Sequence, residues 1–152
     1  MMTMPKITVL YGTETGNSEL LAMDICKEGE NLGLECVNYG MEHIESNDFS
    51  NIENLLIVCS TWGDGEQPDN AIELFDYVEE LDAGELENMK FSVLALGDTA
   101  FDLFCEAGKE WDRVLEEKGA TRIFDRVDCD VDYEDDAEEW IENVLSVFCN
   151  LN

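Results

Sequence analysis

Residues 6–21 read KITVLYGTETGNSELL, and this stretch carries the strongest indication of the fold. The apolar run at 6–11 has the composition of a buried strand. Small and hydroxylated residues follow it, and a helical period begins at Asn17. A strand, a loop rich in Gly and Thr and then a helix form the first half of a βαβ unit. The stretch therefore predicts a parallel sheet covered by helices.

The rest of the chain repeats this alternation. With the first run, apolar segments predict five strands, at 6–11, 34–39, 54–61, 90–97 and 121–127. Helical segments are expected at 17–32, 43–47, 68–81, 103–118 and 135–148. The central strands are apolar on both faces, as they are when helices cover each side of a sheet. The sequence thus predicts one α/β domain over residues 1–152, with three layers and a five-stranded parallel sheet.

The charge balance is strongly acidic. The chain has 37 Asp and Glu against 8 Lys and Arg, a net charge of −29, and no Lys or Arg between Lys27 and Lys90. Such a field repels phosphodiester backbones and anionic lipid, so nucleic acid and membranes are excluded as partners and basic protein surfaces are favoured. Adaptation to a saline habitat explains the total charge equally well.

The cysteines indicate a reducing compartment. Six cysteines are scattered without a CxxC pair or metal-ligand spacing: Cys26, Cys36, Cys59, Cys105, Cys129 and Cys149. No secretory leader is recognisable, and no apolar run approaches the ~20 residues that a membrane span needs. We therefore expect reduced thiols and a cytoplasmic location. His43, the only histidine, lies in a connecting segment and is expected at the surface.

The loop after the first strand has the composition of a phosphate site. Ligands of doubly wound sheets bind beyond the carboxyl ends of the strands, where helix N-termini attract anions. The candidate residues are Thr13, Glu14, Thr15, Gly16, Asn17 and Ser18. The loop lacks both the Gly-Lys-Ser/Thr of a triphosphatase and the three-glycine dinucleotide pattern, and it has no nearby cation, which favours a monophosphate. Taken alone, it fits a capped Thr-rich turn equally well.

Two further loops carry rings at the same edge of the sheet. The loop after the third strand offers Ser60, Thr61, Trp62, Gly63 and Gly65, and the loop after the fourth offers Leu96, Gly97, Asp98, Phe101, Phe104 and Cys105. Beside a phosphate loop, Trp62 is expected to stack on a flat ligand, although a lone Trp more commonly packs on helices. Phe101 could cover the other face of the ring and Asp98 could accept from a ring N–H, while Phe104 also suits the core.

Together the three loops resemble those of the flavodoxins. YGTETGNSE (11–19) is similar to the phosphate loop of that family, and STWGDGE (60–66) and ALGDTAFDLFC (95–105) are similar to its two ring-flanking loops. The resemblance covers 7–148 and extends to the FMN domain of diflavin reductases. It implies a flavodoxin-like sheet of order 2-1-3-4-5, of the short type, and one non-covalently bound FMN.

The resemblance also implies roles for the residues. Residues 13–18 would hold the phosphate, with Trp62 on the inner face of the ring and Phe101 on the outer face. Asp98 and the backbone of Gly97 would meet the pyrimidine edge. The carbonyl of Gly63 would meet the proton that the ring gains at N5. The outer residue of the family is usually Tyr, so the redox potentials of relatives cannot be transferred to a chain with Phe at this position.

The implied function is a low-potential carrier of single electrons that has no substrate of its own. Its expected partners are a flavodoxin or ferredoxin reductase and an acceptor enzyme with basic patches, and we expect a monomer. Carboxylates on the loops would disfavour the second electron. A flavin enzyme that reduces a quinone is the alternative, but no residue in the sequence indicates a substrate pocket.

Two other readings fail on particular residues. A response-regulator receiver needs acids after the first and third strands and a Lys after the fifth, where this chain has Gly12, Thr61 and Asp128. A calcium loop would use Asp128, Asp130, Asp132 and Glu139, but Tyr133 stands where its sharp turn requires Gly. We therefore expect a solvated acidic connection between residues 128 and 139.

Overall fold

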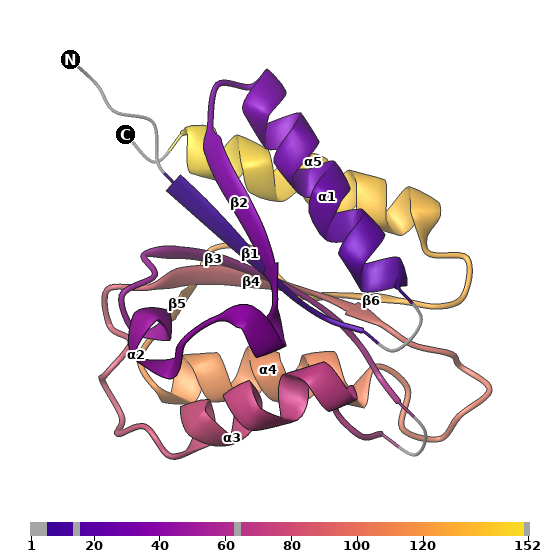
Figure 1. Cartoon of the computed structure of the whole chain (residues 1–152). Coiled ribbons are helices and arrows are strands. Elements are labelled where there is room, and N and C mark those ends of the chain that lie inside the picture. The colour runs from indigo at the N-terminus through magenta and orange to yellow at the C-terminus, as the bar shows by residue number, and fades with distance from the viewer. Residues whose placement is uncertain (1–5, 14–15, 63–64, 151–152) are drawn as a thin grey trace.

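A parallel sheet forms the centre of the computed structural model (Figure 1). β1 (Lys6–Gly12) lies between β2 (Glu35–Gly40) and β3 (Asn54–Ser60), and β4 (Lys90–Leu96) lies beyond β3. The strand order β2-β1-β3-β4-β5 confirms the expected flavodoxin-like topology. The structure describes residues 6–13, 16–62 and 65–150.

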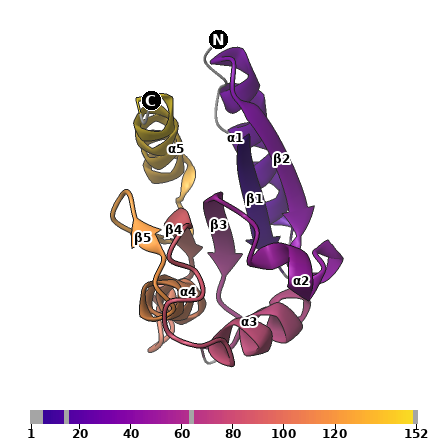
Figure 2. The same ribbon diagram turned by 90° about the vertical axis from the view of Figure 1, so that its left-hand side faces the viewer.

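Helices cover both faces of this sheet (Figures 1 and 2). One face carries α1 (Asn17–Asn31) and α5 (Glu134–Cys149), and the other carries α3 (Ile72–Glu79) and α4 (Glu106–Glu117). The three predicted layers are therefore confirmed. Across residues 6–13, 16–62 and 65–150, every helix is too short or too polar to cross a membrane.

The apolar core is divided between these two faces. Alternate residues of β3 serve each side: Leu56 and Val58 pack with α1 and α5, while Leu55 and Ile57 pack with α3 and α4. All four are 0% exposed because helices close both faces. Trp140 on α5 lies in the first of these layers and Trp111 on α4 in the second. The result is a rigid platform for the loops at the strand ends.

The fifth strand differs from the sequence prediction. The single strand expected at 121–127 is wrong, because two short pieces, β5 (Thr121–Arg122) and β6 (Val127–Cys129), pair with opposite ends of β4. Residues 123–126 leave the sheet between them, and the Phe124 carbonyl there accepts a hydrogen bond from the Ser92 hydroxyl. Arg122, at the end of β5, and Arg126, just before β6, both form ion pairs with Asp112 on α4. These side-chain pairs stand where a continuous strand would pair with β4 through its backbone.

One helix boundary near the carboxyl ends of the strands also differs from the sequence prediction. The helix predicted from residue 103 begins at Glu106, after Cys105 in a left-handed conformation with φ 57°. A Cβ on Gly97 would lie 2.8 Å from the Cys105 nitrogen, so the loop folds back tightly on this glycine. Gly33 and Gly119, left-handed with φ of 83° and 104°, follow the ends of α1 and α4.

Two other helical segments are broken into shorter pieces. The helix predicted at 68–81 is a short turn, η2 (Asp69–Ala71), followed by α3, and Pro68 precedes it in an extended conformation with ψ 150°. The segment expected at 43–47 is η1 (Met41–His43) followed by α2 (Ser46–Phe49). Both breaks lie in connections on the α3 side of the sheet.

Candidate functional site

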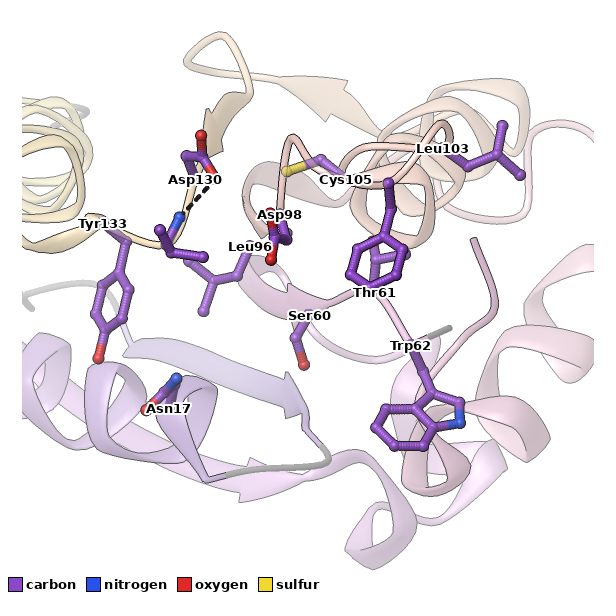
Figure 3. A pocket seen from close by; sticks show the side chains of 13 residues that line it. Asn17, Ser60, Thr61, Trp62, Leu96, Asp98, Leu103, Cys105, Asp130 and Tyr133 are labelled. Atoms are coloured by element: carbon purple, nitrogen blue, oxygen red, sulfur yellow. Dashed lines mark hydrogen bonds between the residues drawn. The ribbon is translucent and has the colours of Figure 1, made fainter. Parts of the chain in front are cut away.

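The loops after β1, β3, β4 and β6 meet at the carboxyl edge of the sheet (Figure 1). They enclose an open cavity of about 420 Å³ (Figure 3). Nine of the sequence-predicted residues line it: Asn17, Ser60, Thr61, Trp62, Leu96, Gly97, Asp98, Phe101 and Cys105. None of its 13 lining residues is Lys or Arg. The arrangement matches the ligand position expected for a doubly wound sheet.

The first loop is built as a cradle in front of α1. The Thr13 hydroxyl accepts a hydrogen bond from the Gly16 N–H at 2.8 Å, and Gly16 turns into the helix with φ 95°. The Asn70 side chain holds this loop in place through two hydrogen bonds: its oxygen accepts from the Thr13 N–H at 2.9 Å, and its amide nitrogen donates to the Tyr11 carbonyl. Glu14 and Thr15, also predicted here, lie outside the described residues.

Ser18 is the residue of this cradle that most clearly indicates a ligand site. Its side chain is 0% exposed, and its hydroxyl has no hydrogen-bond partner among the residues that the structure describes. A buried hydroxyl without a partner is costly and needs an explanation, and a bound ligand supplies one when the hydroxyl lies at a helix N-terminus. Ser18 lies in the first turn of α1, where free N–H groups and the helix dipole attract an anion. The cradle therefore fits a phosphate group held without a cation.

The second loop presents an indole to solvent. Trp62 and Glu66 exchange backbone hydrogen bonds of 2.9 and 2.8 Å, which makes a tight turn that Gly65 completes with φ 100°. Trp62 is 50% exposed, and its indole extends from the loop in Figure 3. The alternative that this Trp packs on helices is therefore wrong. Gly63, predicted to face N5 of the ring, lies outside the described residues.

Side chains fasten the second loop to α4 and to β1. The Thr61 hydroxyl accepts from the Ala107 N–H at 3.0 Å, and the Ser60 hydroxyl donates to the Gly12 carbonyl at 3.3 Å. Gln67 donates to the Ala107 carbonyl and accepts from the Trp111 indole, each at 3.0 Å. The sequence prediction missed Gln67, because no local pattern shows that its amide reaches helix α4.

The third loop supplies a second exposed ring. Phe101 is 53% exposed. Just before it in the chain, the Asp98 carboxylate accepts a hydrogen bond from the Ala100 N–H at 2.8 Å, which shapes the loop that carries the Phe101 ring. A Cβ on Gly65 would come within 2.7 Å of the Leu103 side chain, so the second and third loops are in contact. Exposed apolar side chains on both loops thus border one side of the cavity.

Two other predicted residues of the third loop differ from each other in placement. Cys105 is fully buried and lines the cavity floor, and burial raises its pKa to about 12, so the thiol is neutral. Phe104 does not line this cavity, and its ring lies below the ammonium of Lys109, 5.8 Å from the ring centroid.

A fourth loop, after β6, forms a wall that the sequence prediction missed. Asp130, Val131 and Tyr133 line the cavity, and Tyr133 lies near Asn17 in Figure 3. Hydrogen bonds from Thr99 lower the pKa of Asp130, which is ionised at neutral pH. The sequence contained an indication of this wall, because the carboxyl end of a fifth parallel strand must lie at the same edge of the sheet. The acidic connection between residues 128 and 139, however, suggested only solvated charge.

The residues of this cavity fit FMN. Hydroxyl and backbone donors at α1 suit a monophosphate, the exposed Trp62 and Phe101 rings suit a planar ring system, and the volume lies within the ~300 to 1,000 Å³ usual for such ligands. When bound, FMN supplies a ring that accepts and donates electrons. The chain supplies the phosphate cradle, the two aromatic side chains that would stack on the ring, and carboxylates around the cavity.

Comparison with known proteins gives the same family by sequence. The flavodoxin family model matches residues 9–142. A sulfite reductase (NADPH) flavoprotein alpha-component from Bacillus subtilis (strain 168) is 46% identical over 140 residues, which is 92% of this chain and 23% of that protein. The corresponding protein of Vibrio parahaemolyticus is 38% identical over 140 residues, 92% of this chain and 22% of that protein. This chain therefore spans less than a quarter of these relatives.

Solved structures agree with the sequence comparison. A flavodoxin from Streptococcus pneumonia TIGR4 superposes with a TM-score of 0.83 at 26% identity, over 95% of this chain and 97% of that chain. A cysteine-to-alanine mutant of the Pseudomonas aeruginosa flavodoxin gives a TM-score of 0.82 at 26% identity, over 95% and 99% of the two chains. The chain belongs to the flavodoxin family and is an FMN-binding electron-transfer domain of flavodoxin type.

Proposed function

We propose that this chain carries single electrons at low potential from a reductase to acceptor redox enzymes and has no substrate of its own. The observation that carries the proposal is the combination of an FMN-sized cavity with two half-exposed rings, Trp62 and Phe101, at its rim. An accessible flavin edge allows transfer by contact with another protein. Cys105, the one thiol among the described residues that line the cavity, is not an activated nucleophile, because burial raises its pKa to about 12.

The charges around the cavity support a low potential. Asp98 and Asp130 line it, and Glu66 and Asp102 are exposed on the two ring-bearing loops. A unit negative charge about 10 Å away disfavours another negative charge by roughly 0.5 to 1 kcal/mol at intermediate dielectric. Among the described residues that line the cavity there is no Lys or Arg, so no cation there compensates this repulsion. We expect the second electron to enter at a lower potential than the first.

The same charges support a basic partner. With a net charge of −29, the chain attracts basic protein surfaces over distances comparable to the Debye length of ~10 Å at 0.1 M salt. Apolar side chains at the rim, which include Trp62, Phe101 and Leu103, would then make the close contact. We propose that the carrier works as a cytoplasmic monomer that meets the donor and the acceptor in turn.

The relatives indicate which partners to test first. They are named as components of an NADPH-dependent sulfite reductase. Under the proposal, an NADPH-oxidising flavin reductase is the first donor to test and sulfite reductase is the first acceptor. Neither choice depends on whether the donor shares a polypeptide with this chain.

Stopped-flow reduction by such a reductase tests the proposal. The FMN-loaded chain should be reduced by NADPH only when the reductase is present, and the rate should fall steeply between about 0.05 and 0.5 M salt because screening weakens the attraction. A Glu66→Lys and Asp102→Lys double variant should lose most of this salt dependence. A Glu138→Lys and Glu139→Lys double variant makes the same charge change at exposed positions on α5 and is the matched control.

Two results would contradict the carrier role. One is steady-state NADPH oxidation by the purified chain alone, which would make it an enzyme with a substrate site. The other is a reduction rate that is the same at all salt concentrations, which would remove the electrostatic basis for the partner.

A further inference from the structure

Two thiols outside the FMN cavity lie in unusually close contact. The sulfur atoms of Cys26 on α1 and Cys36 on β2 are 2.8 Å apart. This separation lies between the S–S bond length of about 2.0 Å and the ordinary non-bonded contact of about 3.5 to 4.0 Å. A small displacement of the side chains would therefore bring the two sulfur atoms to bonding distance.

The backbone explains why the two thiols meet. Gly29 follows Cys26 by one helical turn, and a Cβ at Gly29 would lie 3.4 Å from the Cys36 Cβ. The absence of a side chain there lets α1 pack closely on β2. The chain between the thiols turns at Gly33, with φ 83°, so the link is short and ordered. The pair is thus positioned by the fold itself.

The chemistry of this pair differs from that of the other buried thiols. Hydrogen bonds from the Cys36 thiol and the Asn38 side chain lower the pKa of Cys26, while the same contact raises the pKa of Cys36. Burial raises the pKa of both Cys105 and Cys129 to about 12, which leaves them protonated and unreactive. Cys26 and Cys36 are 6% and 7% exposed, so only a small oxidant can reach them.

We propose that Cys26 and Cys36 form a peroxide-sensitive dithiol that closes reversibly into an intramolecular disulfide. The Cys26 sulfur attacks one oxygen of hydrogen peroxide and the O–O bond breaks; the departing hydroxide takes up the proton that Cys26 loses and becomes water, and a sulfenic acid remains on Cys26. The Cys36 sulfur then displaces that oxygen, which departs as water with the Cys36 proton. In total the two thiols lose two electrons and two protons, and one peroxide becomes two waters.

The bond would fix α1 against the edge strand of the sheet. The same helix carries Asn17 and Ser18 of the phosphate cradle at its other end. Closing a loop of about ten residues restricts the unfolded chain, so the oxidised form should unfold on the order of 5 to 10 °C higher than the reduced form. This inference does not depend on the electron-carrier role.

Peptide mapping of peroxide-treated protein tests the proposal. The FMN-loaded chain with Cys149→Ser, which removes the half-buried thiol of α5, is treated with hydrogen peroxide, denatured, alkylated and digested with trypsin and a Glu-specific protease. Cleavage should isolate residues 20–27 and 36–42, each with one thiol of the pair. We expect these peptides joined, with a mass about 2 Da below their sum, and separated again by a dithiol reductant.

Variants separate this pair from buried thiols in general. Cys36→Ser should abolish the cross-link and the thermal shift, and should leave Cys26 as a sulfenic acid that dimedone traps. Cys129→Ala removes a buried thiol of the same core layer and should leave both effects intact. The proposal is overturned if Cys26 and Cys36 are both fully alkylated after peroxide, or if Cys26 passes to sulfinic acid without joining Cys36. The map of the Cys149→Ser protein decides this even if the Cys36 variant does not fold.

Discussion

The Asp130 carboxylate accepts two hydrogen bonds from Thr99, one from the hydroxyl at 2.6 Å and one from the backbone N–H at 3.1 Å. It also accepts from the Val131 N–H at 2.8 Å. These contacts join the loop after β6 to the loop after β4, so two walls of the FMN cavity are held as one unit. Asp130 is therefore a positioning residue as well as a lining residue.

Removal of this carboxylate should loosen the third and fourth loops. We expect Asp130→Ala to weaken FMN binding by about tenfold, because hydrogen bonds to an ionised acceptor are among the stronger ones. Quenching of flavin fluorescence on titration measures the change. Asp132→Ala, at an exposed neighbouring position, should bind FMN like the parent. Equal affinities for both variants would show that the Thr99 contact does not support the cavity.

The same contact predicts a pH dependence. Hydrogen bonds from Thr99 lower the folded-state pKa of Asp130, so the contact contributes stability above the unfolded pKa of about 3.9 and loses it as pH falls through the lower folded value. The difference in FMN affinity between the parent and Asp130→Ala should thus be constant from pH 7 to about pH 4.5 and shrink only below pH 4. A difference that disappears between pH 5 and pH 7 would contradict this assignment.

Ser18 should matter for the phosphate and not for the fold. Ser18→Ala removes a buried hydroxyl that lacks a partner among the described residues, so the apoprotein should be as stable as the parent or slightly more so. FMN binding should weaken by about tenfold, while riboflavin, which has no phosphate, should bind both proteins equally. Isothermal titration with the two ligands measures this.

Ser50 provides the matched control, because its hydroxyl is also buried without a partner in the described part of the chain and lies next to α2, away from the cavity. Ser50→Ala should leave the affinities for both ligands unchanged. If Ser18→Ala weakens riboflavin as much as FMN, the hydroxyl does not serve the phosphate.

The ion pairs of Asp112 should hold the interrupted fifth strand. Asp112, 7% exposed, accepts from Arg122 and Arg126, each at 2.8 Å. Its removal would leave Arg122 with only Glu116 and Arg126 with only Asp128 as a carboxylate partner, so Asp112→Ala should lower the free energy of unfolding by about 1.5 to 3 kcal/mol. The exposed Arg113–Glu117 pair gives the comparison: Glu117→Ala should cost less than about 0.5 kcal/mol. Urea denaturation of the apoproteins measures both, and equal losses would contradict the network.

Glu110 should be a source of instability at neutral pH. Burial raises its pKa in the folded state, so the folded chain binds its proton more tightly than the unfolded chain, and stability falls as pH rises through that pKa. Glu110→Gln should therefore raise the melting temperature at pH 7 by about 2 °C and have little effect at pH 4. Glu138→Gln changes the net charge equally at an exposed position and should not reproduce this pH dependence. A gain in melting temperature of the same size at pH 7 and pH 4 would contradict the raised pKa of Glu110.

The sequence predicted the parts of the fold that depend on local pattern. The buried run of β3 and the Gly-rich loop before α1 were identified because apolar runs and loop composition are local features. The break at 123–126 could not be predicted, because it accompanies side-chain contacts of Arg122 and Arg126 with Asp112 on the preceding helix, which no apolar pattern or loop composition shows. The same reason explains the missed Gln67, whose partners lie about forty residues away.

FMN binding to the apoprotein tests the central claim most directly. Titration with FMN should give one site per chain, with the flavin fluorescence quenched by stacking and a yellow complex. Trp62→Ala and Phe101→Ala should each bind about three- to tenfold more weakly, while Leu20→Ala, an equally exposed apolar residue on α1, should bind normally. A parent protein that stays colourless in excess FMN, or ring variants that bind as tightly as the parent, would contradict the account.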